Sequence, residues 1–248
     1  MKISICIDAV LPGGNDAQKL HALKDAGCSA FEFWAWWDKD LSGIKQAMEE
    51  TGLTCAAMCT RFASLTLPDK RNDYIQGLRD SIKAAKSLGC GVLISQVGDD
   101  TGGDRKEQHT SIAEGLKACA SMLEDAGITL VVEPLNTKID HKGYYLWSSA
   151  EGFNIIREVS SPNIRLLYDI YHQQLMEGNI LNTVSANLDL IGHMHAAGVP
   201  GRRELDQSEL DYRYIFSMLD KYGYPGYMGF EYFPAGDALN SIRKFTKV

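Results

Sequence analysis

The sequence predicts an α/β fold, a single (β/α)₈ TIM barrel with one domain over residues 1–248. Short apolar or β-branched runs alternate with helix-like stretches along the whole chain. There are eight such runs, and eight parallel strands joined by helical crossovers close into a barrel. The length of 248 residues matches the roughly 250 residues that such a barrel needs. A doubly wound open sheet is the alternative, but the loop at residues 11–15 lacks the G-x-G-x-x-G pattern typical of that fold.

The individual elements follow from hydrophobic periodicity. The predicted strands are Ile3–Asp8, Ala30–Trp34, Thr54–Thr60, Val92–Val97, Thr129–Glu133, Ile164–Asp169, Leu190–Ala196 and Tyr227–Tyr232. The predicted helices are Asn15–Ala26, Asp69–Leu88, Arg105–Ala126, Ser149–Val159 and Leu210–Tyr222. Glycine follows the first three of these helices, which is the preferred residue after a helix C-terminus. No Pro/Ser-rich linker or shift in composition marks a domain boundary.

Composition and charge restrict the function classes. The net charge is −7 and no run of Lys or Arg stands out, which argues against a nucleic-acid partner. No stretch of 18 apolar residues predicts a membrane span, and the N-terminal MKISICIDAV does not resemble a signal peptide. The six cysteines form no C-x-x-C pair, so we expect buried free thiols and a cytoplasmic protein.

Ionisable residues end four consecutive predicted strands. The fifth and sixth runs end in Glu133 and Asp169, and the seventh and eighth have His195 and Glu231 one residue before the end. Any one of them could simply cap a helix or face solvent. In a barrel, however, the C-terminal ends of the strands surround the active site, so the four side chains are expected to converge. Three carboxylates at that distance repel one another unless a divalent cation holds them ionised.

This ligand set predicts one divalent metal ion. Three carboxylates and one imidazole, without a thiolate, favour Mn²⁺, with Mg²⁺, Co²⁺ or Zn²⁺ as alternatives. His193 and His195 are two residues apart and point to the same face of the strand. His195 lies nearer the C-terminal end of the strand and is the predicted ligand. His193 is predicted to be a hydrogen-bonded partner one layer deeper.

Two glutamates beside a metal ion can move a proton next to a carbonyl group. One glutamate removes the proton and another returns it to a different position. The alternative chemistry for such a site is metal-assisted hydrolysis of a phosphodiester. Close by in the sequence, Trp34, Trp36 and Trp37 either wall a sugar pocket, with Trp34 or Trp36 the first candidates, or pack a long loop.

Several segments together resemble one known family. The segments are AFEFWAWWDKDL, VVEPLNTKIDHKGYYL, LLYDIYHQQLMEGN, GHMHAAGVPGRRE and GFEYFP. They resemble the hydroxypyruvate isomerase branch of the xylose isomerase-like barrels, a superfamily that includes D-tagatose/D-psicose 3-epimerases and endonuclease IV-type DNA-repair enzymes. The resemblance runs in order from about residue 1 to residue 235.

The resemblance implies a catalytic divalent metal and assigns residues to it. The metal-ligand positions are Glu133, Asp169, His195 and Glu231, and the paired acid/base positions are Glu133 and Glu231. His172 and Arg202 occupy substrate-contacting positions. Glu204 matches a glutamate in the family's GR-x-E loop.

The sequence departs from close relatives around the predicted substrate. Relatives continue GRHEPGTGEINY where this chain has GRRELDQSELDY, so the loop at residues 203–209 differs, and Gly198 stands where they have Asp. Bacterial hydroxypyruvate isomerases often carry Gln in place of His195, whereas 3-epimerases carry His. A glutamate typical of 3-epimerases has Ile139 at its approximate position here. These differences point in opposite directions on the substrate.

The predicted function is a metal-dependent isomerase of a small hydroxycarbonyl compound, of the hydroxypyruvate/tartronate semialdehyde type, acting through a cis-enediolate. A ketose 3-epimerase is the alternative. An endonuclease IV-like enzyme is more remote, because the chain is acidic and has only six histidines for a multi-metal cluster. A metal-binding barrel without catalysis is also open. The expected partners are a small-molecule substrate and other copies of this chain in a homo-oligomer, with no nucleic acid and no membrane.

Overall fold

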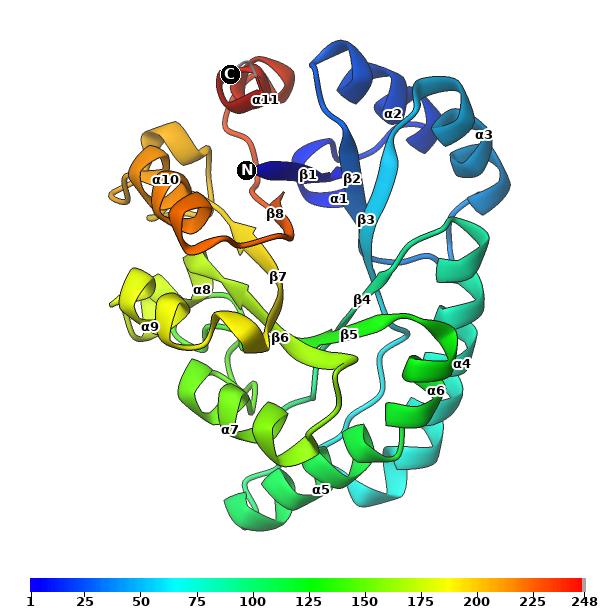
Figure 1. Cartoon of the computed structure of the whole chain (residues 1–248), viewed down its shortest axis with the longest axis vertical. Helices are drawn as coiled ribbons and strands as arrows, with labels where there is room; N and C mark the ends of the chain where they lie inside the picture. The colour runs from blue at the N-terminus through cyan, green and yellow to red at the C-terminus, as the bar shows by residue number, and fades with distance from the viewer. Residues whose placement is uncertain (247–248) are drawn as a thin grey trace.

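Eight parallel strands close into a barrel in the order in which they occur along the chain, which confirms the predicted (β/α)₈ fold (Figure 1). The computed structural model describes residues 1–246. The strands are β1 (Lys2–Cys6), β2 (Ala30–Phe33), β3 (Thr54–Cys59), β4 (Val92–Ser95), β5 (Thr129–Val132), β6 (Ile164–Asp169), β7 (Ile191–Ala196) and β8 (Tyr227–Phe230). The pairing of β8 with β1, in which Gly229 lies opposite Ser4, closes the barrel. Several strands end one or two residues before the predicted boundary, where the chain leaves the sheet at the C-terminal face of the barrel.

Helices surround the barrel on the outside (Figure 1). They are α1 (Ile7–Val10), α2 (Asp16–Asp25), α3 (Leu41–Thr51), α4 (Arg71–Ser87), α5 (Arg105–Lys117), α6 (Ala120–Ala126), α7 (Ser149–Val159), α8 (Ile170–Met176), α9 (Ile180–Ala186), α10 (Tyr212–Tyr222) and α11 (Ala238–Thr246). Gly52, Gly127 and Gly223 end α3, α6 and α10 in the left-handed conformation that glycine adopts readily.

The prediction of one helix over Arg105–Ala126 was wrong, because the structure has two helices there. Ala118 and Cys119 separate α5 from α6. The Cys119 amide bonds to the Leu116 carbonyl three residues back, in place of the i−4 bond of an α-helix. The Cys119 side chain is fully buried at this turn. The buried face of the chain therefore continues from α5 into α6, so hydrophobic periodicity alone does not predict the break between the two helices.

The barrel interior has an apolar half and a polar half. Ala57, Cys59, Ile94, Val131 and Leu167, from β3 to β6, form an apolar cluster of their own. Buried polar side chains, Ser4, Glu32, His193 and His195, come from β1, β2 and β7 instead. Polar groups inside a barrel need partners, so this half carries the structure's internal hydrogen-bonding network.

All six cysteines are free and buried, and they lie in the first half of the chain. They are Cys6, Cys28, Cys55, Cys59, Cys90 and Cys119. Burial raises the pKa of the Cys28 and Cys119 thiols to about 12. Among residues 1–246, no helix has both the length and the apolar character needed to cross a bilayer.

Candidate active site

A cavity of about 530 Å³ lies at the C-terminal ends of the strands. Its walls are partly aromatic, with Trp34, Trp37 and Phe233 among the lining residues. The charged residues Glu133 and Glu231 line it as well. The volume lies in the range of sites for small molecules, and the mixture of apolar walls and few polar groups is typical of such sites.

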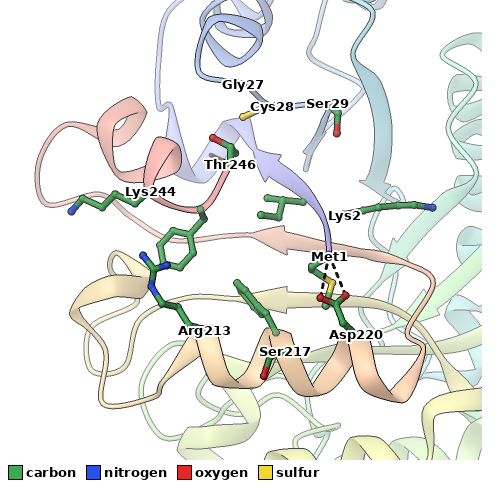
Figure 2. A pocket seen from close by; sticks show the side chains of 13 residues that line it. Met1, Lys2, Gly27, Cys28, Ser29, Arg213, Ser217, Asp220, Lys244 and Thr246 are labelled. Atoms are coloured by element: carbon green, nitrogen blue, oxygen red, sulfur yellow. Dashed lines mark hydrogen bonds and ion pairs between the residues drawn. The ribbon is translucent and has the colours of Figure 1, made fainter. Parts of the chain in front are cut away.

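A second cavity of similar volume lies at the opposite, N-terminal end of the strands (Figure 2). Lys2, Cys28, Arg213 and Lys244 contribute to its lining, and the amino group of Met1 forms an ion pair of 3.1 Å with Asp220 beside it. None of the predicted site residues reaches this cavity.

The four predicted metal ligands come together at the first cavity. Glu133, Asp169, His195 and Glu231 each offer one ligand atom, and these atoms lie within 4.8 Å of one another. Nδ1 of His195 is 3.7 Å from Oε1 of Glu133 and 3.6 Å from Oε2 of Glu231. All four side chains are buried, and they come from the ends of β5, β6, β7 and β8.

Several of these atoms have no hydrogen-bond partner within the described residues. They are Oε1 of Glu133, Oδ2 of Asp169, and Nδ1 of His195. A buried polar atom without a partner costs free energy. The four residues together offer an oxygen-rich donor set with one imidazole within 4.8 Å, so the residues present fit a divalent metal ion.

The two glutamates have pKa values shifted in opposite directions. Burial, together with the charges of Glu231 and Asp169, raises the pKa of Glu133 to about 8. Burial acts on Glu231 in the same sense, but the Arg202 guanidinium and the His195 ring outweigh it and hold its pKa well below the usual range. Near neutral pH and without a metal ion, Glu231 is therefore a carboxylate while Glu133 still holds a proton.

Two groups bind the Glu231 carboxylate directly. Arg202 forms an ion pair with Oε2 of Glu231. The indole Nε1–H of Trp34 donates to Oε1 at 2.5 Å. Trp37 also lines the cavity, whereas Trp36 points away and donates to Ser81 Oγ at 3.2 Å. Trp34 and Trp37, but not Trp36, therefore form part of the wall.

His172, predicted to contact substrate, lies behind Asp169 and is not among the residues lining the cavity. Its side chain is fully buried, and its Nε2 is 3.6 Å from Oδ2 of Asp169. Asn136 donates to its Nδ1 at 2.6 Å. Burial and the nearby Arg202 hold the pKa of His172 well below its usual value, so the ring is neutral and Nε2 carries the proton that faces Asp169. Arg202, the other predicted substrate contact, does line the cavity.

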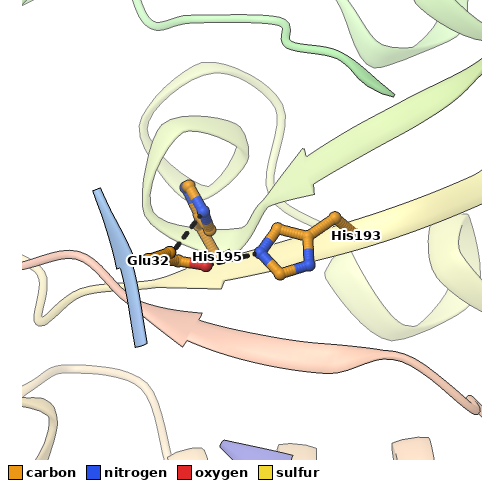
Figure 3. A group of neighbouring side chains, drawn as sticks. All are labelled: Glu32, His193 and His195. Atoms are coloured by element: carbon orange, nitrogen blue, oxygen red, sulfur yellow. Dashed lines mark hydrogen bonds and ion pairs between the residues drawn. The ribbon is translucent and has the colours of Figure 1, made fainter. Parts of the chain in front are cut away.

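Sequence reasoning missed Glu32. This residue lies on β2, and its carboxylate contacts the rings of both His193 and His195 (Figure 3). Its Oε2 is 2.9 Å from Nε2 of His193, and its Oε1 is 3.1 Å from Nε2 of His195. Burial tends to raise the pKa of Glu32, but the charges of His195 and His193 lower it to about 2. The available signal was a single carboxylate, flanked by Phe31 and Phe33, at the inward position of an apolar strand.

His193 is the hydrogen-bonded partner one layer deeper that its position predicts. Glu204 is also buried, and its Oε1 accepts backbone hydrogen bonds from Ala235 at 2.8 Å and Gly236 at 3.2 Å. It therefore ties the loop that carries Arg202 to the segment after β8.

Comparisons with known proteins agree with this architecture. A model of the family "Xylose isomerase-like TIM barrel" matches residues 20–247. A 2-oxo-tetronate isomerase from Cupriavidus necator is 37% identical over 219 residues, covering 84% of this chain and 83% of that protein. A putative hydroxypyruvate isomerase from Mus musculus is 31% identical over 240 residues, covering 91% of this chain and 86% of that protein.

Solved structures show the same barrel. A structure described as an AP endonuclease, family 2, from Brucella melitensis superposes with a TM-score of 0.94 at 26% identity, over 99% of this chain and 98% of that chain. An L-ribulose 3-epimerase superposes with a TM-score of 0.82 at 20% identity, over 98% and 91% of the two chains, and so shares the fold.

Proposed function

The chain belongs to the xylose isomerase-like TIM barrel family, and from this premise we propose that it is an isomerase of a small hydroxycarbonyl compound. The substrate is of the hydroxypyruvate/tartronate semialdehyde type, which the name of one relative, putative hydroxypyruvate isomerase, supports. The other relative is named 2-oxo-tetronate isomerase and supports the broader class of small hydroxycarbonyl compounds. The observation that carries the proposal is the pair of glutamates, Glu133 and Glu231, which line one cavity and offer ligand atoms within 4.8 Å of each other and of those of Asp169 and His195. Such pairs are typical of acid/base catalysis.

Glu133, Asp169, His195 and Glu231 would hold one divalent cation, for which Mn²⁺ is the preferred ion. When bound, it would act as a Lewis acid on the carbonyl and hydroxyl oxygens of the substrate and make the adjacent C–H more acidic. The remaining chemistry belongs to the side chains.

Glu231, ionised and oriented by Trp34 and Arg202, would accept the proton from the carbon next to the carbonyl. Loss of that proton gives a cis-enediolate. The proton would return from Glu231, directly or by way of the ionised Glu133, to the former carbonyl carbon, and the hydroxyl proton passes to the former carbonyl oxygen. An isomer then forms without gain or loss of atoms, and both carboxylates are restored. The Arg202 guanidinium lies where it can offset negative charge that develops in the cavity.

A ketose 3-epimerase is the second candidate, and the size of the cavity favours it. About 530 Å³ accommodates a longer sugar than a three-carbon acid, and the rings of Trp34 and Trp37 offer apolar faces to its C–H surface. In that reaction the same glutamates would act on opposite faces of one carbon.

Proton exchange in D₂O tests the proposal. The protein is incubated with Mn²⁺ and hydroxypyruvate, tartronate semialdehyde or a panel of ketoses, and deuterium is located by NMR. Deuterium beside the carbonyl together with a rearranged skeleton supports the isomerase, whereas inversion at one carbon of a ketose supports the epimerase. The absence of exchange in every compound, with metal bound, would contradict both.

A further inference from the structure

We infer that Glu32 is a positioning residue that holds the ring of His195 through Nε2, so that Nδ1 faces Glu133 and Glu231. The inference rests on the metal centre of the proposed function. Glu32 itself does not line the cavity and is not among the four proposed ligands.

Glu32 reaches its partners across the interior of the barrel. It starts from β2, whereas His193 and His195 lie on β7, with β1 and β8 in between. Its Oε2 accepts a hydrogen bond from Ser4 Oγ at 3.0 Å and lies 2.9 Å from Nε2 of His193. Its Oε1 lies 3.1 Å from Nε2 of His195 (Figure 3). One carboxylate thus joins three of the eight strands.

Gly229 provides the space for this crossing. Gly229 pairs with Ser4 on one side and with His195 on the other. A Cβ atom here would overlap Oε1 of Glu32 and lie 2.6 Å from Cδ2 of His195. The position needs glycine because of this close approach, since any side chain would push the carboxylate and the ring apart.

The contacts of Glu32 determine which nitrogen of His195 faces the cavity. Nε2 of His193 forms a hydrogen bond with Oε2 of Glu32, whereas Nε2 of His195 lies 3.1 Å from Oε1 in a charge contact without hydrogen-bond geometry. For His195 this leaves Nδ1 on the cavity side, 3.7 Å from Oε1 of Glu133 and 3.6 Å from Oε2 of Glu231. A carboxylate behind a ligating histidine fixes the ring orientation in this way.

The Glu32→Gln variant tests the inference, because an amide must present one donor group to partners that are themselves donors. We expect the affinity for Mn²⁺, measured by calorimetry, to fall about 10- to 100-fold. A cooperative thermal transition with a Tm close to that of the wild type would show that the variant is folded. Tyr74→Phe is the matched control. It breaks another buried hydrogen bond of the barrel wall, Tyr74 OH to Ser95 Oγ at 2.7 Å, and leaves the site intact, so its Mn²⁺ affinity should equal that of the wild type.

Histidine-selective ¹⁵N NMR of the metal-free protein supplies a readout that a purely structural role would not move. In the wild type, slowly exchanging ring protons on Nε2 of both His193 and His195 are expected. In Glu32→Gln the slowly exchanging Nε2 proton of His195 should be lost, because the carboxylate that faces it in the wild type is gone. If the wild type binds no Mn²⁺, the metal centre of the proposed function fails, and these spectra still decide whether Glu32 positions the ring.

Gly229→Ala tests the contact between Glu32 and His195 without removing a hydrogen-bonding group, because the added Cβ would push the two side chains apart. We expect a similar loss of Mn²⁺ affinity. Gly91→Ala, where a Cβ meets nothing within 4 Å, is the matched control and should bind as the wild type does. The inference is overturned if Glu32→Gln and Gly229→Ala both fold, bind Mn²⁺ within about threefold of wild type and leave the His195 spectrum unchanged.

Discussion

Glu133 and Glu231 are the same residue type on one cavity wall, yet their neighbours differ. Glu231 has a guanidinium and an indole N–H on its two oxygens, and both favour the ionised form. Glu133 has an oxygen without a partner in the described residues and sits near other carboxylates, which favours the neutral form. The different roles proposed for the two residues follow from these contacts.

Replacing either glutamate by glutamine should remove turnover. Glu133→Gln and Glu231→Gln keep the size of the side chain but remove the proton acceptor, so we expect kcat to fall on the order of 1,000-fold. The measurement is the rate of product formation with Mn²⁺ at saturating metal. Activity within about tenfold of wild type for either variant would contradict its acid/base role.

Trp34→Phe should lower kcat while leaving the protein folded. The change removes the N–H that donates to Oε1 of Glu231 and keeps an aromatic ring in the wall. A hydrogen bond to a charged group contributes about 1.5–3 kcal/mol, which corresponds to a loss of roughly 10- to 100-fold. Trp36→Phe is the control, because its N–H bonds to Ser81 away from the cavity. Equal kcat values for the two variants would show that the indole does not orient Glu231.

At the scale of elements, the loop between β7 and α10 carries Arg202 to the cavity. Arg202 has a φ of 56°, a left-handed conformation that costs free energy in a residue with a Cβ. The buried Glu204 fastens this loop to Ala235 and Gly236. The same loop thus brings the guanidinium to Glu231 and is held in place by the segment after the neighbouring strand β8.

Glu204→Ala should therefore impair catalysis from outside the cavity. Without the two backbone hydrogen bonds, we expect Arg202 to lose its fixed position and kcat/KM to fall by roughly tenfold. Glu204→Gln retains an accepting oxygen and should behave nearly as the wild type. Asp206 lies on the same loop and forms a surface ion pair with Lys244 of α11. Asp206→Ala breaks this ion pair, is the control, and should change kcat/KM little. If Asp206→Ala and Glu204→Ala are equally impaired, the tether is not the cause.

The sequence predicted site residues best where their position at a strand end determines where they lie in the barrel. Strand ends carry Glu133, Asp169, His195 and Glu231, and the barrel topology alone brings them together. Glu32 lies within a strand, and its partners are 161 and 163 residues away, at positions that only strand closure brings near.

Three other features depend on packing that periodicity does not record. The break between α5 and α6 keeps the same face of the chain buried. The short helices α8 and α9 are about two turns long, which is too short for a clear hydrophobic period. His172 shares its sequence neighbourhood with Asp169 but lies behind it, because α8 begins directly after Asp169 and turns the ring away from the cavity.

At the scale of the whole molecule, the site couples stability to pH. Folding raises the pKa of Glu133 from 4.5 to about 8, so the stability that its bound proton supplies is fully present below about pH 4.5 and is lost as pH rises through about 8. Burial acts against protonation of His195, but Glu32 and Glu231 raise its pKa well above 6.5, so this contribution too is lost towards high pH. The metal-free barrel is therefore expected to become less stable between pH 6 and pH 8.

Added Mn²⁺ should raise the Tm more at pH 8 than at pH 6, because a dication binds the ionised forms of these ligands. The measurement is thermal unfolding with and without Mn²⁺ at both pH values. The metal-free Glu133→Gln variant should show a smaller decrease in Tm between them. An equal effect of Mn²⁺ at pH 6 and pH 8 would contradict this linkage.

The six buried thiols lie between residues 6 and 119, whereas the proposed ligands lie between residues 133 and 231. Alkylation of a thiol needs exposure and a thiolate, so each labelled cysteine other than Cys59, which lines the cavity, records an opening of the first four βα units. Pulsed alkylation followed by mass spectrometry would time the opening of one half of the barrel while Mn²⁺ stabilises the other. If Mn²⁺ slows labelling at every cysteine, the two halves open as a single cooperative unit. If labelling is unaffected, the barrel contains two separable folding units joined at the β4–β5 and β8–β1 seams.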